Sequence, residues 1–224
     1  MLKVNFDDYA EKYDDILTSQ LEFFDSDNAY FSEYKVLVLK KLLTAEPNTI
    51  LDFGCGVGRS TEFLKKHFSS STIYGCDLSE KSLIQARERV PTALFLTPDQ
   101  IEKSAMTFDV IFIACVFHHI PLADRVSVMK SIVDVCSNSG KIIIFEHNPY
   151  NPMTRYLVHR CPFDRDAILL TPAELKKIGL AVGIKNIRHH YTLFFPSQLR
   201  WLRIFESYLR FLPLGGQYVV EARL

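Results

Sequence analysis

The sequence predicts an α/β fold built on a doubly wound, mainly parallel sheet, and three observations support this prediction. Five runs of residues are nearly continuous in apolar side chains, which is typical of strands covered on both faces by helices. These runs lie at 48–53, 71–77, 92–96, 108–115 and 140–147. Helical patterns separate several of them, and strands that alternate with helices form parallel sheets through right-handed crossovers. A glycine-rich turn directly follows the first run, and such turns approach ligands with backbone amides.

The helices between these strands are predicted by apolar periodicity and by start and stop signals. Helical patterns occur at 59–68, 79–89 and 122–136. Ser79 is the expected N-cap of the second, and "SNSG" is expected to end the third. Each of these three helices therefore lies between two predicted strands.

The flanking regions follow a different order. Residues 6–45 predict two helices, and Asp27 or Asn28 is a plausible cap of the second. After residue 147 we expect a polar loop at 148–170, a helix at 171–179, a strand at 184–194, an aromatic-rich helix at 197–211 and a last strand at 215–224. We expect the aromatic-rich helix to bury one face on the sheet. Its remaining apolar strip, within 193–212, could contact a partner subunit, an apolar substrate or a bilayer surface.

Composition narrows the classes of partner. Lys plus Arg and Asp plus Glu number 26 each, so the net charge is zero and no global field attracts nucleic acid. The five cysteines contain no CxxC pair and are interpreted as reduced thiols. The first residues are acidic and lack a signal-peptide pattern, and the longest apolar run is too short to span a bilayer. These features favour a cytoplasmic location.

The glycine turn "ILDFGCGVGRSTEF" at 50–63 distinguishes between nucleotide-like ligands. A triphosphate-binding loop closes with Gly-Lys-Ser/Thr, whereas this turn closes with Gly58, Arg59 and Ser60. A dinucleotide turn has the spacing GxGxxG, and counting from Gly54 and Gly56 places Arg59 at the third glycine. The triphosphate interpretation fails, and the dinucleotide interpretation is weakened.

Four ordered motifs instead resemble those of the class I S-adenosylmethionine-dependent methyltransferases. Asp52 precedes the GxGxG turn by two residues, and Asp77 ends the second strand in "YGCDLSEKSLIQAR". The stretch "FDVIFIACVFHHI" resembles the family's fourth strand with the segment beside the methionine moiety, and "SGKIIIFEHN" resembles its fifth strand. The motifs cover roughly residues 50–147 in the family's order.

The resemblance implies a Rossmann-like sheet of seven strands in the order 3-2-1-4-5-7-6, with the last strand antiparallel. It implies one methyltransferase domain over 1–224, and S-adenosylmethionine as the cofactor. Residues 1–47 would form a helical cover, 48–147 the cofactor-binding core, and 148–224 the substrate loop and the closing hairpin of the sheet.

Residues of the cofactor site follow from the same resemblance. Asp52 would hold the amino group of the cofactor, Asp77 would accept hydrogen bonds from both ribose hydroxyls, and Leu78 would pack on adenine. Asp99 is the only acid near the expected adenine amino group. The other residues expected at the cofactor are Gly54, Cys55, Gly56, Gly58, Ala114, Cys115 and Tyr13. Tyr13, like Tyr9, would belong to the N-terminal helical cover and lie over the cofactor. Alternatively, these tyrosines would pack the first helix against the rest of the domain.

Four residues are expected at the acceptor site because the fourth and fifth strands end side by side over the cofactor. They are His118, His119, Glu146 and His147. Histidine titrates near neutrality and can take a proton from the acceptor. Neighbouring histidines are expected to point apart, so at most one of His118 and His119 would face the substrate. Alternatively, the "HHI" step only orders the loop. No metal is predicted, because no ligand spacing of the HExxH kind is present.

The 148–170 loop is expected to select the acceptor. Tyr150 and Arg155 are predicted at the rim of the acceptor pocket, where an arginine could bind a carboxylate or phosphate group of the acceptor. Alternatively, the arginines of the loop pair with Asp164 and Asp166. The "NPYN" stretch lacks the second proline of the NPPY-type motif and follows the fifth strand, which argues against nucleic-acid substrates. We therefore expect methyl transfer to a small-molecule acceptor. The alternatives are a non-catalytic cofactor-binding protein and a nicotinamide-dependent oxidoreductase.

Overall fold

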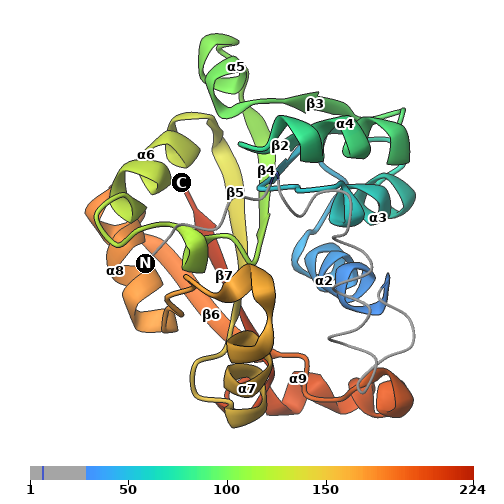
Figure 1. The fold of residues 1–224 in the computed structure, drawn as a ribbon, viewed down its shortest axis with the longest axis vertical. Helices are drawn as coiled ribbons and strands as arrows, with labels where there is room; N and C mark the ends of the chain where they lie inside the picture. Colours follow the sequence, from blue (N-terminus) through green and yellow to red (C-terminus); the bar gives the residue numbers. More distant parts are fainter. Residues whose placement is uncertain (1–6, 8–28) are drawn as a thin grey trace.

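The computed structural model describes Asp7 and residues 29–224, and within these residues one seven-stranded sheet forms the centre of the molecule (Figure 1). The strand order is β3-β2-β1-β4-β5-β7-β6. The strands are β1 (Thr49–Phe53), β2 (Thr72–Cys76), β3 (Leu94–Leu96), β4 (Phe108–Ala114), β5 (Cys136–His147), β6 (Asn186–Thr192) and β7 (Gln217–Arg223). Only β7 runs antiparallel to its neighbours, β5 and β6. The predicted fold class and strand order are confirmed.

Helices cover both faces of this sheet (Figure 1). Their bounds are α2 (Ala29–Leu42), α3 (Arg59–His67), α4 (Glu80–Arg89), α5 (Pro98–Lys103), α6 (Arg125–Asp134), α7 (Pro152–Arg160), α8 (Pro172–Ala181) and α9 (Glu206–Leu209). Buried residues of α2, α3 and α4 pack on one face, and those of α6 and α8 pack on the other.

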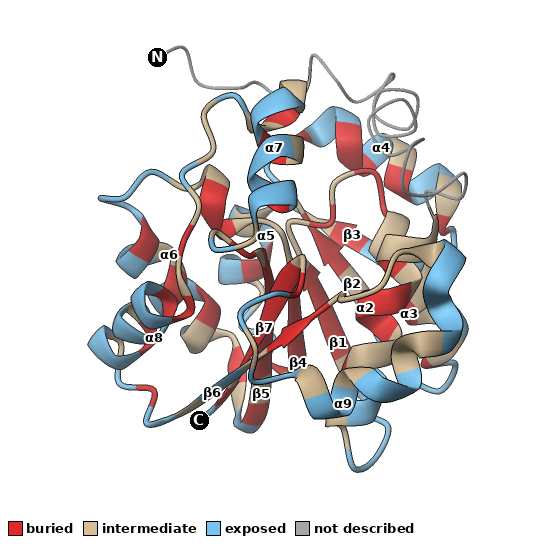
Figure 2. Cartoon of the chain, turned by 90° about the horizontal axis from the view of Figure 1, so that it is seen from below, coloured by how far each residue is buried: buried red, intermediate tan, exposed pale blue. Residues whose placement is uncertain are grey.

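Strand β4 shows why the predicted strands are apolar throughout. Val110 and Phe112 belong to the core on the α2–α4 side, whereas Ile111 and Ile113 belong to the core on the α6–α8 side. Successive side chains of a strand point to opposite faces, so a strand buried on both faces needs an apolar residue at every position. Figure 2 shows the buried strands at the centre of the molecule.

Several helix starts follow their predicted signals. The Ser79 side chain accepts a hydrogen bond from the Ser82 amide at the start of α4, as the sequence predicts. Thr171 and Glu174 form a reciprocal capping box that begins α8. The first predicted N-terminal helix and the cap choice between Asp27 and Asn28 lie outside the described residues.

The 148–170 segment is not one loop, contrary to the prediction. It contains α7 and a 3-10 turn at Pro162–Asp164. Asn151 caps α7 by accepting a hydrogen bond from the Thr154 amide, and Pro152 occupies the first turn, where its missing amide costs nothing. The prolines and asparagines that suggest a loop are therefore a helix-start signal.

The 197–211 segment also differs from the prediction. It forms a 3-10 helix at Ser197–Phe205, interrupted by non-helical geometry at Leu199, and then the short α9. None of its residues is buried, and Trp201 is 65% exposed, so the expected buried face on the sheet is absent (Figure 2).

Strand β5 begins at Cys136 and includes the residues "SNSG", which the sequence predicts as a helix stop before the strand. Among the described residues, no helix combines the length and apolarity needed to cross a membrane.

Candidate active site

The turn between β1 and α3 has a backbone that only glycine adopts easily. Gly54, Gly56 and Gly58 have φ values of +75°, +52° and +81°. A Cβ at Gly54 would lie 2.4 Å from Cγ2 of Val116, whereas nothing lies within 4 Å of a Cβ at Gly56. The Gly54 position therefore allows the turn to approach the end of β4, and Gly56 borders open space.

Replacing Gly54 with alanine is expected to destabilise the fold by about 2–4 kcal/mol, because positive-φ strain adds to a clash with Val116. Gly183→Ala is the matched control. Its φ is +92° but no atom lies within 4 Å of the new Cβ, so only the strain of roughly 1–2 kcal/mol remains. Urea unfolding of both variants measures the difference. An equal loss of unfolding free energy in the two variants would show that the clash with Val116 contributes nothing.

Gly58 has a different role from the other two glycines. A Cβ there would lie 3.1 Å from Cβ of Ala86, so its absence lets the start of α3 pack on α4. Gly58 does not line the cavity, although its neighbours Val57 and Arg59 do. Gly58 therefore has a packing role, and its contact with the cofactor stays a prediction.

Asp77 lies immediately beyond β2, and its side chain forms a hydrogen bond with the glycine turn. Its Oδ2 accepts a hydrogen bond from the Gly56 amide at 2.8 Å, and its Oδ1 accepts one from the Ser79 amide at 2.9 Å. Burial raises the pKa of this carboxyl, although these amides act in the opposite direction. Next to it, Leu78 is 84% exposed and lines the cavity, so this leucine offers an uncovered apolar surface. Asp7 reaches the same place, since the Ser79 hydroxyl donates to its Oδ1 at 2.5 Å.

Asp52, near the end of β1, is almost fully buried. The Thr61 hydroxyl donates to its Oδ2 at 2.7 Å. Burial, with a further contribution from the charge of Asp77, raises the pKa of Asp52 to about 7, although the Thr61 hydrogen bond opposes this. A buried carboxylate at the edge of a cavity favours a cationic partner.

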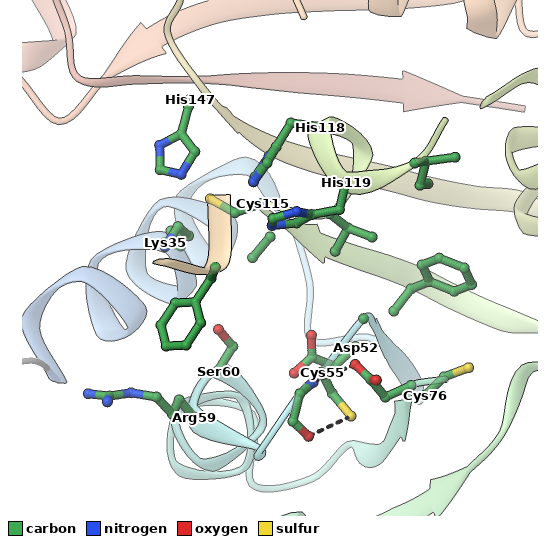
Figure 3. Close-up of a pocket in the computed structure, with 18 of the residues that line it drawn as sticks. Lys35, Asp52, Cys55, Arg59, Ser60, Cys76, Cys115, His118, His119 and His147 are labelled. Atoms are coloured by element: carbon green, nitrogen blue, oxygen red, sulfur yellow. Dashed lines mark hydrogen bonds between the residues drawn. The ribbon is translucent and has the colours of Figure 1, made fainter. Parts of the chain in front are cut away.

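A cavity of about 1550 Å³ extends from this turn to the ends of β4 and β5 (Figure 3). Single-ligand pockets usually measure about 300–1,000 Å³, so this cavity has room for two small molecules. One part is lined by Asp52, Gly54, Cys55, Gly56, Asp77 and Leu78. Another part is lined by Lys35, Ala114, Cys115, His118, His119 and His147. The predicted acceptor histidines and most predicted cofactor residues therefore border one continuous space.

Glu146 orients His118 from beneath the cavity. The Glu146 side chain is fully buried, and its Oε1 accepts the amides of Val116 and Phe117 at 3.0 and 2.7 Å. Its Oε2 lies 2.6 Å from Nδ1 of His118. Burial opposes both charges, but the pairing lowers the pKa of Glu146 and raises that of His118. Glu146 does not line the cavity, and its observed contacts hold the histidine turn and the His118 ring.

His118 and His119 do not diverge as predicted. Both lie on a 3-10 turn at Phe117–His119, their ring centroids are 4.1 Å apart, and both line the cavity. A 3-10 turn does not alternate its side chains as a strand does, which explains the difference. Asp164 Oδ1 lies 3.4 Å from His118 Nε2 and 3.3 Å from His119 Nε2.

Two further groups complete this part of the cavity. Asp166 Oδ1 lies 3.6 Å from His119 Nδ1, so Asp164 and Asp166 face histidines and not the arginines expected from the sequence. Burial, with the charge of His118, lowers the pKa of His147 to about 4, so this imidazole is neutral near pH 7.

Some predicted site residues lie away from the cavity. Tyr150 and Arg155 are exposed and do not line it. Tyr150 lies in the turn before α7, and the helical geometry of α7 turns Thr154 and Val158 inward in place of Arg155. Asp99 lies in the first turn of α5 and does not line the cavity, whereas Glu102 on the same helix does. Tyr13 and Tyr9 lie outside the described residues.

Lys35 and Asp164 are cavity residues that were not predicted from the sequence. Lys35 is a buried lysine on α2 that lines the cavity, and its place directly before the apolar run 36–39 is the signal that could have revealed it. Asp164 belongs to the 3-10 turn after α7 and carries no local motif.

Comparisons with known proteins find methyltransferases. Residues 51–142 match a family model described as a methyltransferase domain. Trans-aconitate 2-methyltransferase of Afipia carboxidovorans is 31% identical over 109 residues, which are 48% of this chain and 41% of the relative. Malonyl-[acyl-carrier protein] O-methyltransferase of Herminiimonas arsenicoxydans is 33% identical over 112 residues, 50% of this chain and 38% of the relative.

A solved structure matches over most of the chain. The S-adenosylmethionine-dependent methyltransferase from Archaeoglobus fulgidus superimposes with a TM-score of 0.69 at 16% identity, covering 91% of this chain and 97% of that one. The shared fold, the matched glycine-turn region and the curated relatives agree on one assignment. Together they support a class I S-adenosylmethionine-dependent methyltransferase.

The same comparisons support S-adenosylmethionine as the cofactor. The matched part of this methyltransferase spans only about two fifths of the length of the two curated relatives. The matched region contains the glycine turn, Asp77, His118 and His119, and it ends at residue 142, before His147 and Asp164.

Proposed function

We propose that this methyltransferase transfers the methyl group of S-adenosylmethionine to a small-molecule acceptor and releases S-adenosylhomocysteine. One observation carries the proposal: a single cavity joins the glycine turn and its two carboxylates to a separate cluster of histidines. Its volume of about 1550 Å³ exceeds what one small ligand needs. Cofactor and acceptor would therefore share this space, as an in-line displacement requires.

The cofactor would lie along the glycine turn. Each oxygen of Asp77 already accepts one backbone amide, and a carboxylate oxygen can accept a second hydrogen bond, so both ribose hydroxyls could donate to this residue. The uncovered side chain of Leu78 would pack against adenine. Asp52 would pair with the cationic amino group, which offsets the cost of burying its carboxylate.

The acceptor would occupy the part of the cavity between Lys35 and the histidines. S-adenosylmethionine would supply a methyl group bound to a positively charged sulfur, and the acceptor's nucleophilic atom would take this methyl group while the electron pair of the broken carbon–sulfur bond would stay on sulfur. The acceptor's proton, where it has one, passes to a neighbouring base or to water. The protein's part is mainly to align the acceptor, because an in-line displacement depends on geometry.

An acceptor with an anionic group fits this region best. Lys35 brings an ammonium group to the cavity beside the histidines, where it would stabilise a carboxylate or phosphate. Two curated relatives are named for trans-aconitate and malonyl-[acyl-carrier protein], both of which carry carboxylates. Small carboxylic acids are therefore the first acceptors to test.

Binding of S-adenosylmethionine is expected to weaken at low pH. Because the pKa of Asp52 is raised to about 7 in the ligand-free protein, the carboxyl is protonated below that pH and cannot pair with the amino group. The affinity should fall by roughly tenfold for each pH unit below about 7 and level off above it. Calorimetric titrations between about pH 5.5 and 8 measure this slope. Asp52→Asn should bind more weakly and with a flatter profile, and an unchanged profile would exclude Asp52 as the titrating group.

Methyl transfer itself can be tested with S-adenosylmethionine labelled on the methyl group and a panel of small carboxylic acids. Label should move to an acceptor with equimolar release of S-adenosylhomocysteine, and Asp77→Ala should abolish both. A chain that binds the cofactor but transfers no label to any of a broad set of oxygen, nitrogen and sulfur acceptors would favour a non-catalytic binding protein.

A further inference from the structure

We propose that His118, His119 and Asp164 form a binding site for one divalent transition-metal ion of the zinc type. This inference goes beyond the proposed methyl transfer, and it departs from the sequence-based expectation of no metal. Three ligand atoms, one from each residue, lie within 4.8 Å of one another. Two imidazole nitrogens and one carboxylate oxygen are a donor set that zinc accepts.

The distances favour a metal over direct ion pairs. His118 Nε2 and His119 Nε2 lie 3.4 and 3.3 Å from the same oxygen, Oδ1 of Asp164. A hydrogen bond between an imidazolium and a carboxylate measures about 2.7–2.9 Å, so both contacts are about 0.5 Å too long. Ligand atoms about 2.0–2.1 Å from a tetrahedral zinc ion are about 3.3–3.4 Å apart. The two observed distances therefore match edges of a zinc tetrahedron.

A carboxylate orients one of the two imidazoles. Glu146 Oε2 lies 2.6 Å from Nδ1 of His118. In metal sites a carboxylate commonly accepts the Nδ1 proton of a ligand histidine, which directs the lone pair of Nε2 at the ion. His118 has this arrangement, whereas Asp166 Oδ1 lies 3.6 Å from Nδ1 of His119, which is too far for a hydrogen bond. The Nε2 atoms of both histidines lie near Asp164.

The fold fixes the segments that carry the ligands before any ion binds. The Ile168 amide donates to the His118 carbonyl at 2.8 Å, which joins the segment after Asp164 to the histidine turn. Arg125 is buried and donates to the carbonyls of Ile120 and Ile168 at 3.0 and 2.7 Å. The two segments are therefore tied together at the backbone, and the ligand side chains need little rearrangement.

Three protein ligands leave one tetrahedral position open, as in zinc sites that bind a substrate or water. His118, His119 and Asp164 all line the cavity that includes the glycine turn. An oxygen of the acceptor could take the open position, and this role, unlike metal binding itself, rests on the proposed function. Lys35 in the same cavity is compatible with an anionic acceptor held by the ion.

Metal titration of the full chain tests the site without reference to activity. The protein is treated with chelator, dialysed and titrated with Co²⁺ and, separately, with Zn²⁺. We expect one equivalent of Co²⁺ to bind with the visible absorption of a tetrahedral complex, and Zn²⁺ to displace it. His119→Ala and Asp164→Ala should each lower the affinity by at least about 100-fold, because each removes one of three ligands.

Asp124→Ala is the matched control, because Asp124 lines the same cavity but does not belong to the cluster. It should leave metal affinity unchanged. Absence of stoichiometric binding, or equal affinity in wild type and the His119 and Asp164 variants, would overturn the proposal. S-adenosylmethionine binding by each variant shows that it is folded. A chain that binds the cofactor but no metal would refute this site alone, and a chain that binds metal but no cofactor would refute the proposed function alone.

Discussion

Asp77→Ala is expected to weaken S-adenosylmethionine binding by at least about 100-fold. Two ribose hydroxyls would donate to this carboxylate, and hydrogen bonds to charged groups contribute about 1.5–3 kcal/mol each. The variant also removes the acceptor of the Gly56 and Ser79 amides, which loosens the glycine turn. Isothermal titration calorimetry with S-adenosylmethionine measures the loss.

Asp99→Ala is the control for this experiment. Asp99 was the sequence-based candidate for the adenine amino group, but it does not line the cavity, so its removal should change the affinity less than about twofold. Near-wild-type binding by a folded Asp77→Ala protein would contradict the ribose assignment. A large loss for Asp99→Ala would restore the original prediction for that residue.

Glu146→Ala is expected to lower the free energy of unfolding by about 3–5 kcal/mol. The carboxylate is fully buried and partners two backbone amides as well as His118. Alanine would leave these groups buried without their acceptor, and the full desolvation cost of each would then appear. Urea unfolding in the presence of a chelator measures the effect without any contribution from metal.

Glu174→Ala provides the comparison. Glu174 is an exposed glutamate in the capping box of α8, and the loss of a helix cap costs about 1 kcal/mol. The two glutamate variants therefore remove the same chemical group from a buried and an exposed setting. Equal destabilisation would show that Glu146 does not hold the histidine turn.

The sequence predicts most of the cofactor side of the cavity because local spacing determines it. Asp52, the glycine turn and Asp77 follow the ends of two adjacent parallel strands, and strand order alone brings such residues together. Backbone conformation at Gly54 and Gly56 is likewise a local property. These residues could be placed without knowledge of any long-range contact.

The acceptor side could not be predicted in the same way. Asp164 meets His118 and His119 because α7 brings a distant segment back over the ends of β4 and β5. A prediction that treats residues 148–170 as a loop takes no account of the helical period of α7, which turns the Arg155 side chain outward. Lys35 reaches the cavity from α2, which precedes all the sheet motifs in sequence.

Titration of the wild-type chain with S-adenosylmethionine, S-adenosylhomocysteine and NADH tests the central claim most directly. The cavity geometry predicts that both S-adenosyl compounds bind at one site per chain and compete with each other, and that NADH does not bind, because Arg59 replaces the third glycine of a dinucleotide turn. Binding of NADH alone, or of none of the three by folded protein, would contradict the assignment of this cavity to S-adenosylmethionine.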